Sequence, residues 1–285
     1  MVVVRKRTRG KKAYYYLEYS IRKGKKVVKK EKYLGTEIPK DIDNIKKQFE
    51  KEIQLELYKK LERIRDSFQA EWQKTPDSVK EKQLGEIAIA FTYNTNAIEG
   101  STITLEETRE ILHDNIAPNK PLRDIKETEA HAKAFLEMLH KQEKVTKELI
   151  LRWHNDIFGQ TKPDIAGRFR EYLVRVGVYR APNWQDVGKL MKELIEFINK
   201  NKKMNPVTLA AKAHYRFEKI HPFGDGNGRI GRLLMNHILW HNGYPMLIIE
   251  YKKRKSYYKA LSRDEDSFTN YFIKQYLSIH KKRQL

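Results

Sequence analysis

The sequence predicts a mainly α-helical protein with a small basic β-module at its N-terminal end. Apolar residues recur every three or four positions over most of the chain after residue 40, which is the spacing of amphipathic helices. The segment before it is instead dense in aromatic and β-branched side chains, which favour strands. We expect three parts: a basic β-hairpin appendage over residues 1–37, a long linking helix over residues 38–77, and one large helical domain over residues 78–285.

The appendage is predicted from residues 13–35, which read as two strands joined at Lys23-Gly24-Lys25. Because an isolated hairpin is marginally stable, we expect it to pack on another element or to gain a further strand from Val2 to Arg5. Its tyrosines can stack on bases, but they can equally form the core of this small module. We favour the core.

The charge of the chain is unevenly distributed. The formal net charge is +21, and residues 1–36 carry thirteen Lys and Arg against two Glu. Clustered basic residues release counterions from a phosphate backbone, so a nucleic-acid partner for residues 1–36 is one hypothesis. A well-solvated surface, or adaptation to heat through surface ion pairs, explains the same charge.

Composition also bounds the class of protein. No apolar run approaches 18 residues, so we expect no transmembrane helix, and the N-terminal valine run is too short for a signal peptide. The sequence contains no cysteine, which excludes disulfides and thiolate metal sites and fits a reducing compartment. We therefore expect a soluble cytoplasmic protein without a membrane partner.

The helical body begins with one long amphipathic helix over residues 41–72, which Thr75-Pro76-Asp77 ends. Ser78 is expected to cap the next helix, and Gly100 to follow its end. The residues Thr104 to Glu107 are typical of a capping box for a third helix. Further helices are expected over residues 79–98, 123–142, 146–159, 186–201, 206–220, 227–242 and 253–279, with one hairpin-like segment over residues 168–180.

The segment HPFGDGNGRIGR, residues 221–232, concentrates polar chemistry in one short turn between two expected helices. Gly226 and Gly228 let the backbone approach a ligand closely, and the helix that follows offers unpaired N–H groups to an anion. Arg229 and Arg232 are three residues apart, so both can point to one side of the first helical turn. Because their forked donors suit phosphate oxygens, the turn predicts a phosphate-binding site.

Three further residues of this turn have expected roles. Asp225 can hold Mg²⁺, which commonly uses one carboxylate plus substrate phosphates. His221 can accept a proton from an incoming hydroxyl, and Phe223 is expected to anchor the turn in the core. The spacing excludes a Walker A loop, a dinucleotide fingerprint and a calcium loop. A plain glycine-rich surface loop is the alternative, and the co-location of these groups argues against it.

The pattern His-Pro-Phe-x-Asp-Gly-Asn-Gly-Arg-x-x-Arg resembles the signature of Fic-domain proteins at every fixed position. The resemblance implies a Fic-type helical domain with a small β-hairpin flap that transfers AMP from ATP to a Ser, Thr or Tyr hydroxyl of a target protein. It implies that His221 is the general base and that Asp225 coordinates Mg²⁺. It also assigns the α- and β-phosphates to Gly226, Asn227 and Gly228, further phosphate contact to Arg229, and the γ-phosphate to Arg232.

The resemblance extends over about residues 84–277. AGRFRE, residues 166–171, is similar to the family's Gly-x-x-Arg approach to the flap, and the hairpin that follows resembles the flap that registers the target backbone. SYYKAL, residues 256–261, is similar to the family's Tyr-x-x-Ala-Leu helix near the adenine pocket. This places Tyr257 and Tyr258 among the expected ATP-binding residues.

A second motif, TNAIEG, lies at residues 95–100 on the helix ahead of the core, about residues 79–99. It resembles the family's inhibitory motif, and this implies that Glu99 pairs with Arg232 and keeps the γ-phosphate from binding productively. A hundredfold suppression needs about 2.7 kcal/mol, and one charge-assisted pair supplies roughly 1.5–3 kcal/mol. The alternative is that Glu99 merely occupies the last turn of a helix.

Several functions stay open on the sequence alone. The leading one is a Mg²⁺-dependent protein adenylyltransferase that modifies an unknown target or itself. The same pocket can also remove AMP from a modified protein, if Glu99 orients water, or transfer another nucleotide. A rival from another class is a nucleic-acid-binding regulator with a vestigial Fic core. The apolar stripe of the helix over residues 41–72 permits a homodimer, although burial in the core explains it as well.

Overall fold

The structure is a computed structural model that describes residues 2–23 and 26–284. It divides the chain into two compact units, Met1–Glu62 and Arg63–Leu285. The boundary falls inside helix α1 (Ile42–Lys74), so the two ends of this helix belong to different units.

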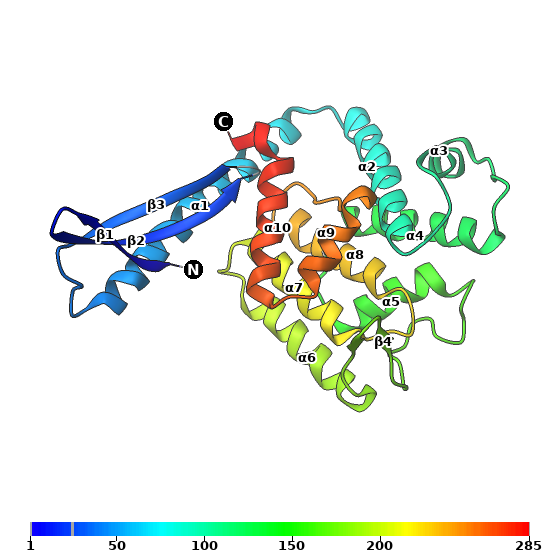
Figure 1. Ribbon diagram of the computed structural model, residues 1–285. Helices are drawn as coiled ribbons and strands as arrows, with labels where there is room; N and C mark the ends of the chain where they lie inside the picture. Colours follow the sequence, from blue (N-terminus) through cyan, green and yellow to red (C-terminus); the bar gives the residue numbers. More distant parts are fainter. Residues whose placement is uncertain (1, 24–25, 285) are drawn as a thin grey trace. The chain divides into compact units, whose positions relative to one another are not determined.

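The first unit combines a three-stranded antiparallel sheet with the N-terminal part of α1 (Figure 1). β1 (Val3–Arg9), β2 (Lys12–Lys23) and β3 (Lys26–Gly35) lie in that order, with β2 in the middle. β1 is the further strand expected near Val2 to Arg5, and it runs four residues beyond Arg5. The turn expected at Lys23-Gly24-Lys25 includes Gly24 and Lys25, which lie outside the described residues.

The core of the first unit consists of aliphatic side chains and a phenylalanine. Its buried residues are Val2, Leu17 and Phe49, and Phe49 comes from α1. The expectation that the tyrosines form this core holds only in part: Tyr19 is half-buried and packs against it, whereas Tyr33 is 54% exposed, with its ring 5.2 Å from that of Tyr16. The reason is that α1 supplies apolar side chains, Phe49 among them, so the buried positions do not depend on the tyrosines alone.

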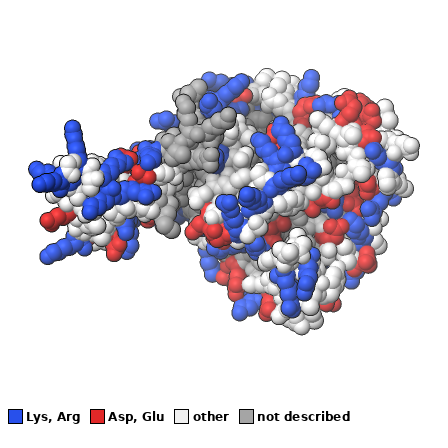
Figure 2. Space-filling view, in the orientation of Figure 1, with Lys and Arg blue, Asp and Glu red and all other residues white. Residues whose placement is uncertain are grey.

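Lys and Arg side chains dominate the visible face of this unit (Figure 2). Part of the charge is neutralised locally. Glu18, on β2, is buried and pairs with Lys29 at 3.1 Å and with Arg7 at 3.4 Å. Lys32 pairs with Glu52 of α1 at 3.0 Å, so ion pairs join the sheet to the helix as well.

The second unit is helical, and helix α8 (Asn227–Trp240) lies at its centre (Figure 1). Every residue of α8 from Asn227 to Leu239 is buried, and the helix contacts α2, α4, α5 and α7. The other helices are α2 (Asp77–Ile98), α3 (Leu105–Arg109), α4 (Leu122–His140), α5 (Lys147–Phe158), α6 (Trp184–Lys200), α7 (Pro206–Ile220), α9 (Arg254–Leu261) and α10 (Glu265–Ile279). Short turns add η1 (Glu110–Asp114), η2 (Tyr251–Lys253) and η3 (Lys281–Gln284). The mainly α-helical class and the small β elements agree with the prediction.

Two local expectations are corrected and one is confirmed. The single helix expected over residues 253–279 is two helices, because Asp264 accepts a hydrogen bond from the Ser267 N–H and starts α10. Ser78 does not cap α2, since this helix begins at Asp77 after Pro76, without a side-chain cap. The capping box is present: the Thr104 hydroxyl accepts from the Glu107 N–H, and the Glu107 carboxylate accepts from the Thr104 N–H.

The apolar stripe of α1 is buried within this chain. Phe49 lies in the core of the first unit, and in the second unit Phe68 packs against Trp72 and Trp240. The stripe therefore gives no reason to expect a homodimer. No helix of the described residues is long and apolar enough to cross a membrane.

The flap is smaller than the expected hairpin over residues 168–180. β4 (Arg175–Val176) and β5 (Tyr179–Arg180) pair over two residues each, with Gly177 at a φ of +58° in the turn. Val178 at the tip is fully exposed, while the Tyr179 hydroxyl donates to the Lys219 carbonyl at 2.7 Å. The base of the flap is thereby fixed to the end of α7.

Candidate active site

The turn between α7 and α8 is held from within by an asparagine. Asn227 accepts from the Phe223 N–H at 2.8 Å and donates to the Phe223 carbonyl at 2.9 Å. Phe223 is buried, as expected, and its ring stacks on His154 of α5 at 3.8 Å. His154 also fixes the turn from below, since its Nε2 donates to the Asp225 carbonyl at 3.0 Å while its Nδ1 accepts from the Gly167 N–H.

The glycines of the turn are required by close contacts and backbone geometry. Gly226 has a φ of +78°, and a Cβ there would lie 2.3 Å from the Phe158 ring. A Cβ on Gly228 would lie 2.1 Å from the Glu99 carboxylate and 2.9 Å from the Arg232 guanidinium. The start of α8 thus leaves room for the side chain of Glu99, which follows α2, and the first N–H groups of a helix have no partner within that helix.

We predict that Gly226→Ala lowers the free energy of unfolding by about 3 kcal/mol, since it adds left-handed strain and a steric clash with Phe158. Urea unfolding measures the change. Gly177→Ala is the matched control, because Gly177 also has a positive φ but nothing within 4 Å of its added Cβ. It should cost only the strain, about 1–2 kcal/mol. Equal losses in the two variants would contradict a tight contact at Gly226.

His221 lies at the entrance of the turn in a left-handed conformation, with φ 52° and ψ 61°. Burial lowers the pKa of His221, although nearby acids act in the opposite direction, so the neutral imidazole that a general base requires is favoured. Arg170 clamps this residue in place. It is buried and donates to four carbonyls, those of His221 at 2.8 Å, Tyr172 at 2.7 Å, Pro182 at 2.7 Å and Ile220 at 3.4 Å.

We predict that Arg170→Ala lowers the free energy of unfolding by about 3–5 kcal/mol, because four carbonyls lose a charged donor. The control is Arg168→Ala, since exposed Arg168 donates only to the Pro163 carbonyl at 3.1 Å among the bonds of the described residues. That variant should lose less than about 0.5 kcal/mol. Chemical denaturation of both variants compares the losses, and a small loss for Arg170→Ala would contradict the clamp.

Glu99 and Arg232 form an ion pair at the N-terminal turn of α8. The Arg232 guanidinium donates to Glu99 Oε1 at 2.6 Å and to the Thr95 carbonyl at 3.2 Å. Its side chain is 1% exposed and that of Glu99 is 29% exposed. Burial alone would lower the pKa of Arg232, but the Glu99 carboxylate beside it raises the pKa above its usual value. Glu99 thus places a negative charge where the start of α8 attracts one.

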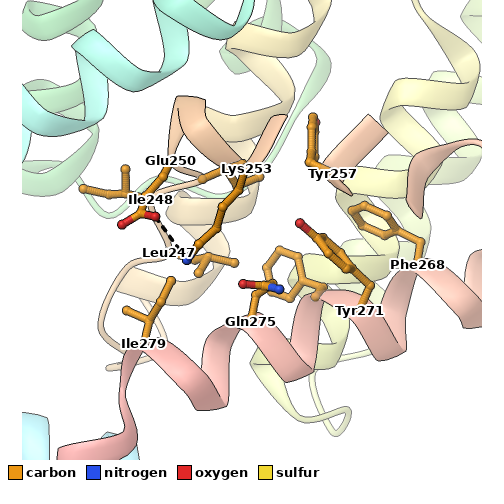
Figure 3. A pocket seen from close by; sticks show the side chains of 11 residues that line it. Leu247, Ile248, Glu250, Lys253, Tyr257, Phe268, Tyr271, Gln275 and Ile279 are labelled. Atoms are coloured by element: carbon orange, nitrogen blue, oxygen red, sulfur yellow. Dashed lines mark ion pairs between the residues drawn. The ribbon is translucent and has the colours of Figure 1, made fainter. Parts of the chain in front are cut away.

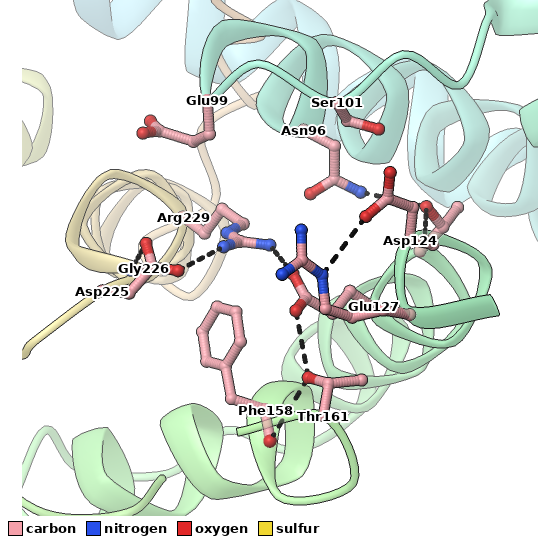
Figure 4. Close-up of polar contacts among 12 residues, drawn as sticks. Asn96, Glu99, Ser101, Asp124, Glu127, Phe158, Thr161, Asp225, Gly226 and Arg229 are labelled. Carbon is pink, nitrogen blue, oxygen red and sulfur yellow. Dashed lines mark hydrogen bonds and ion pairs between the residues drawn. The ribbon is translucent and has the colours of Figure 1, made fainter. Parts of the chain in front are cut away.

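A second ionic cluster surrounds Asp225, and Figure 4 shows part of it. Asp225 Oδ1 accepts from the Gly226 N–H at 2.6 Å, and Asp225 Oδ2 pairs with Lys162 at 2.7 Å. Arg229 lies 3.6 Å from Asp225 Oδ2 and pairs more closely with buried Glu127 of α4. Both predicted phosphate arginines are therefore engaged by carboxylates.

The residues present fit a magnesium ion only in part. Within the described residues no three His, Cys, Asp or Glu side chains converge on one point. Asp225 is a single carboxylate, 48% exposed and close to the start of α8, and one carboxylate with substrate phosphates is a common magnesium ligand set. The donor set fits Mg²⁺ that arrives with a nucleotide.

The two tyrosines expected near adenine lie in different surroundings. Tyr257 is buried, and its hydroxyl hydrogen bonds with His214 Nε2 at 2.8 Å. Tyr258 is 43% exposed, and its hydroxyl donates to the Ile98 carbonyl at 3.2 Å, next to Glu99. A pocket beside Tyr257 (Figure 3) has a volume of about 20 Å³, too small for a nucleobase. Tyr258 is thus the one of the two that is open to a ligand.

Four residues of the site were not singled out as site residues from the sequence: His154, Lys162, Arg170 and Glu127. Arg170 is the arginine of the Gly-x-x-Arg pattern within AGRFRE. Its burial explains why an arginine is needed at this position of the motif. Glu127 and Lys162 carry no local signal, because each reaches the loop from a separate part of the chain. Lone Glu and Lys residues are most often solvated surface groups.

Helices packed around a buried α8, with a glycine-rich loop at its start, define a helical domain with an anion-accepting helix terminus. Residues 144–239 match the model of the Fic/DOC family. A similar curated protein is the protein adenylyltransferase Fic of Nematostella vectensis, 35% identical over 189 residues, 64% of this chain and 44% of that protein. Fic-1 of Caenorhabditis elegans, a protein adenylyltransferase, is 34% identical over 63% of this chain and 37% of its own. The chain spans less than half the length of these relatives.

Solved structures agree with these matches. A Fic-1 segment from C. elegans superposes with a TM-score of 0.68 at 28% identity, over 83% of this chain and 72% of that chain. A Fic-domain-containing signalling protein from Bacteroides thetaiotaomicron superposes with a TM-score of 0.68 at 25% identity, over 79% of this chain and 97% of that chain. Residues 144–239 thus match the Fic/DOC family, and solved Fic proteins share the fold of this chain.

Proposed function

We propose that this protein is a Mg²⁺-dependent protein adenylyltransferase, which transfers AMP from ATP to a Ser, Thr or Tyr hydroxyl and is restrained by Glu99. The observation that carries the proposal is one turn that combines a base with an anion-accepting helix start, His221 and Gly226 to Gly228, in a Fic domain. Relatives of about 35% identity bear the name protein adenylyltransferase. The target is an unknown protein or this chain itself.

The proposed reaction forms one bond and breaks one. The target oxygen attacks the α-phosphorus of ATP, a new O–P bond forms, and the bond to the bridging oxygen breaks, so pyrophosphate leaves. His221 takes the hydroxyl proton on its neutral imidazole. The N–H groups at the start of α8 and the guanidinium of Arg229 stabilise the charge that develops on the phosphoryl oxygens. Asp225 would hold Mg²⁺, which supplies charge neutralisation of the phosphates when bound.

The inhibition follows from competition for one guanidinium. Arg232 is the residue proposed for the γ-phosphate, and the Glu99 carboxylate is bonded to it at 2.6 Å. A γ-phosphate and the Glu99 carboxylate are both anions that would occupy the same donor, so they exclude one another. Release of Glu99 is therefore the step that permits productive ATP binding.

Label transfer tests the reaction class. The Glu99→Gly variant is incubated with Mg²⁺ and ATP labelled at either the α- or the γ-phosphate, and protein-bound label is counted. The proposal expects label from the α-position only. Label from the γ-position would indicate phosphate transfer and contradict it. No label from either position, with release of AMP from a modified protein, would favour removal of AMP, for which the partly exposed Glu99 carboxylate is suited to orient water.

Binding of nucleic acid by residues 1–36 is a separate proposal, supported by the net basic charge of the first unit. A salt-dependent mobility shift of DNA or RNA tests it. Neutral replacements of exposed Arg5, Lys6 and Arg9 should abolish the shift. If no shift occurs at low salt, the charge serves solvation alone.

A further inference from the structure

The ammonium group of Lys162 lies within the candidate active site but has no role in the proposed reaction. Lys162 follows α5, and its Nζ lies 2.7 Å from Asp225 Oδ2 and 2.9 Å from Glu127 Oε1. The Phe158 ring lies 5.0 Å from the same nitrogen. The side chain is 18% exposed, so this lysine is held inside the site and does not project into solvent.

Two carboxylates thus converge on one positively charged group. Glu127 is 8% exposed at its side chain; its Oε1 also accepts from the Thr161 hydroxyl at 3.0 Å, and its other oxygen pairs with Arg229. Figure 4 shows Glu127 between Thr161 and Arg229, above the Phe158 ring. The two carboxylates of this cluster, those of Glu127 and Asp225, pair with two cationic side chains, those of Lys162 and Arg229. The cluster is therefore neutral without any added ion.

The ammonium nitrogen Nζ lies between one oxygen of Asp225 and one of Glu127, so it occupies oxygens that could otherwise bind a cation. Divalent cations are bound by carboxylate oxygens, and Asp225 Oδ2 is the oxygen that the Gly226 N–H does not use. While Lys162 pairs with that oxygen, a metal ion must displace the ammonium group and add two charges to a neutral cluster. Repulsion from the nearby Arg229 guanidinium opposes this further.

We infer that Lys162 is a built-in competitor of the divalent cation, which occupies Asp225 in the nucleotide-free protein and gives it up only when the negative phosphates arrive. This inference rests on the proposed role of Asp225 as the metal ligand. It makes binding of the metal and the nucleotide cooperative, because the phosphates supply the negative charge that lets the ammonium and the metal coexist. The ammonium then lies near the phosphates as an additional cation.

Binding of Mn²⁺ without nucleotide tests this, measured by electron paramagnetic resonance of free Mn²⁺. The expected result is that Lys162→Met binds Mn²⁺ at least about tenfold more tightly than the wild type, since Asp225 and Glu127 both lose their ammonium partner and the cluster becomes negatively charged. Lys162→Arg, which keeps the charge, should bind like the wild type. Lys200→Met is the matched control, because it removes one charge from a 2.7 Å pair with Glu196 on the surface of α6.

Two outcomes would overturn the inference. One is equal Mn²⁺ affinity in Lys162→Met and the wild type. The other is tighter binding that persists in Lys162→Met/Asp225→Asn, which would place the metal elsewhere. Thermal unfolding of each variant confirms that the fold is kept. Failure here is distinct from failure of the proposed reaction, since this measurement contains no nucleotide and counts no AMP.

Discussion

Replacement of His221 by Ala in the Glu99→Gly protein is expected to lower the rate of AMP transfer about a thousandfold, because a positioned general base contributes roughly 10²–10⁴ in rate. His221→Asn is the better matched variant. Asn tolerates the left-handed backbone that this residue adopts, and its side-chain amide cannot act as a general base. Both variants should lose activity equally, while His113→Ala, whose exposed imidazole lies on η1, should lose none.

The pH dependence of the same reaction follows from the burial of this imidazole. Burial lowers the pKa of His221 below its usual 6.5. The neutral, active form therefore persists as the pH falls to 6.5, and the rate declines only when the pH drops through the lowered pKa. A rate profile between pH 5 and 8 measures this. A rate that already halves near pH 7.5 would contradict His221 as the group that accepts the proton.

Replacement of Glu99 by Gly is expected to raise the rate of AMP transfer about a hundredfold, since one buried charge-assisted pair is worth roughly 1.5–3 kcal/mol. Glu99→Gln, which removes the charge and keeps the shape, should raise it by a smaller factor. Glu106→Gln, on the exposed start of α3, is the matched control and should change nothing. The rates are compared at equal ATP concentration.

Replacement of Glu99 by Gly should also change how strongly ATP stabilises the protein against thermal unfolding. Without Glu99 the buried guanidinium of Arg232 loses its carboxylate partner, which costs about 3–5 kcal/mol in buried pairs. ATP with Mg²⁺ supplies a new anion, so it should raise the melting temperature of Glu99→Gly more than that of the wild type. Equal shifts in the two proteins would mean that Glu99 and ATP do not compete.

The loop was predictable because its chemistry is local. The proline and the glycines that separate the two helices all lie within twelve residues. The structure places His221 at the C-terminal end of α7 and Gly226 at the N-terminal end of α8. The helices themselves follow from the apolar spacing. The break before α10 also had a local signal, since Asp264 is an ordinary N-cap followed by Ser267, but the apolar pattern continues across it.

The ion pairs were not predictable from the chain in the same way. Glu127 and Arg229 are 102 residues apart, and the carboxylate becomes a partner only because α4 packs beside α8. Arg170 is similar, because its four acceptors come from the end of α7, the loop after it and both sides of the flap. Tyr257 and Tyr258 differ by one position on α9, so which of them faces the core depends on Phe268 and His214 of neighbouring helices.

Intact mass spectrometry of the purified protein after incubation with ATP and Mg²⁺ tests the proposed activity and its restraint together. We predict the added mass of AMP on Glu99→Gly, less on the wild type, and none on Glu99→Gly/His221→Asn. A Glu99→Gly protein that gains no AMP, or that gains it equally with His221 replaced, would contradict an AMP transferase that works through this loop and is held by Glu99.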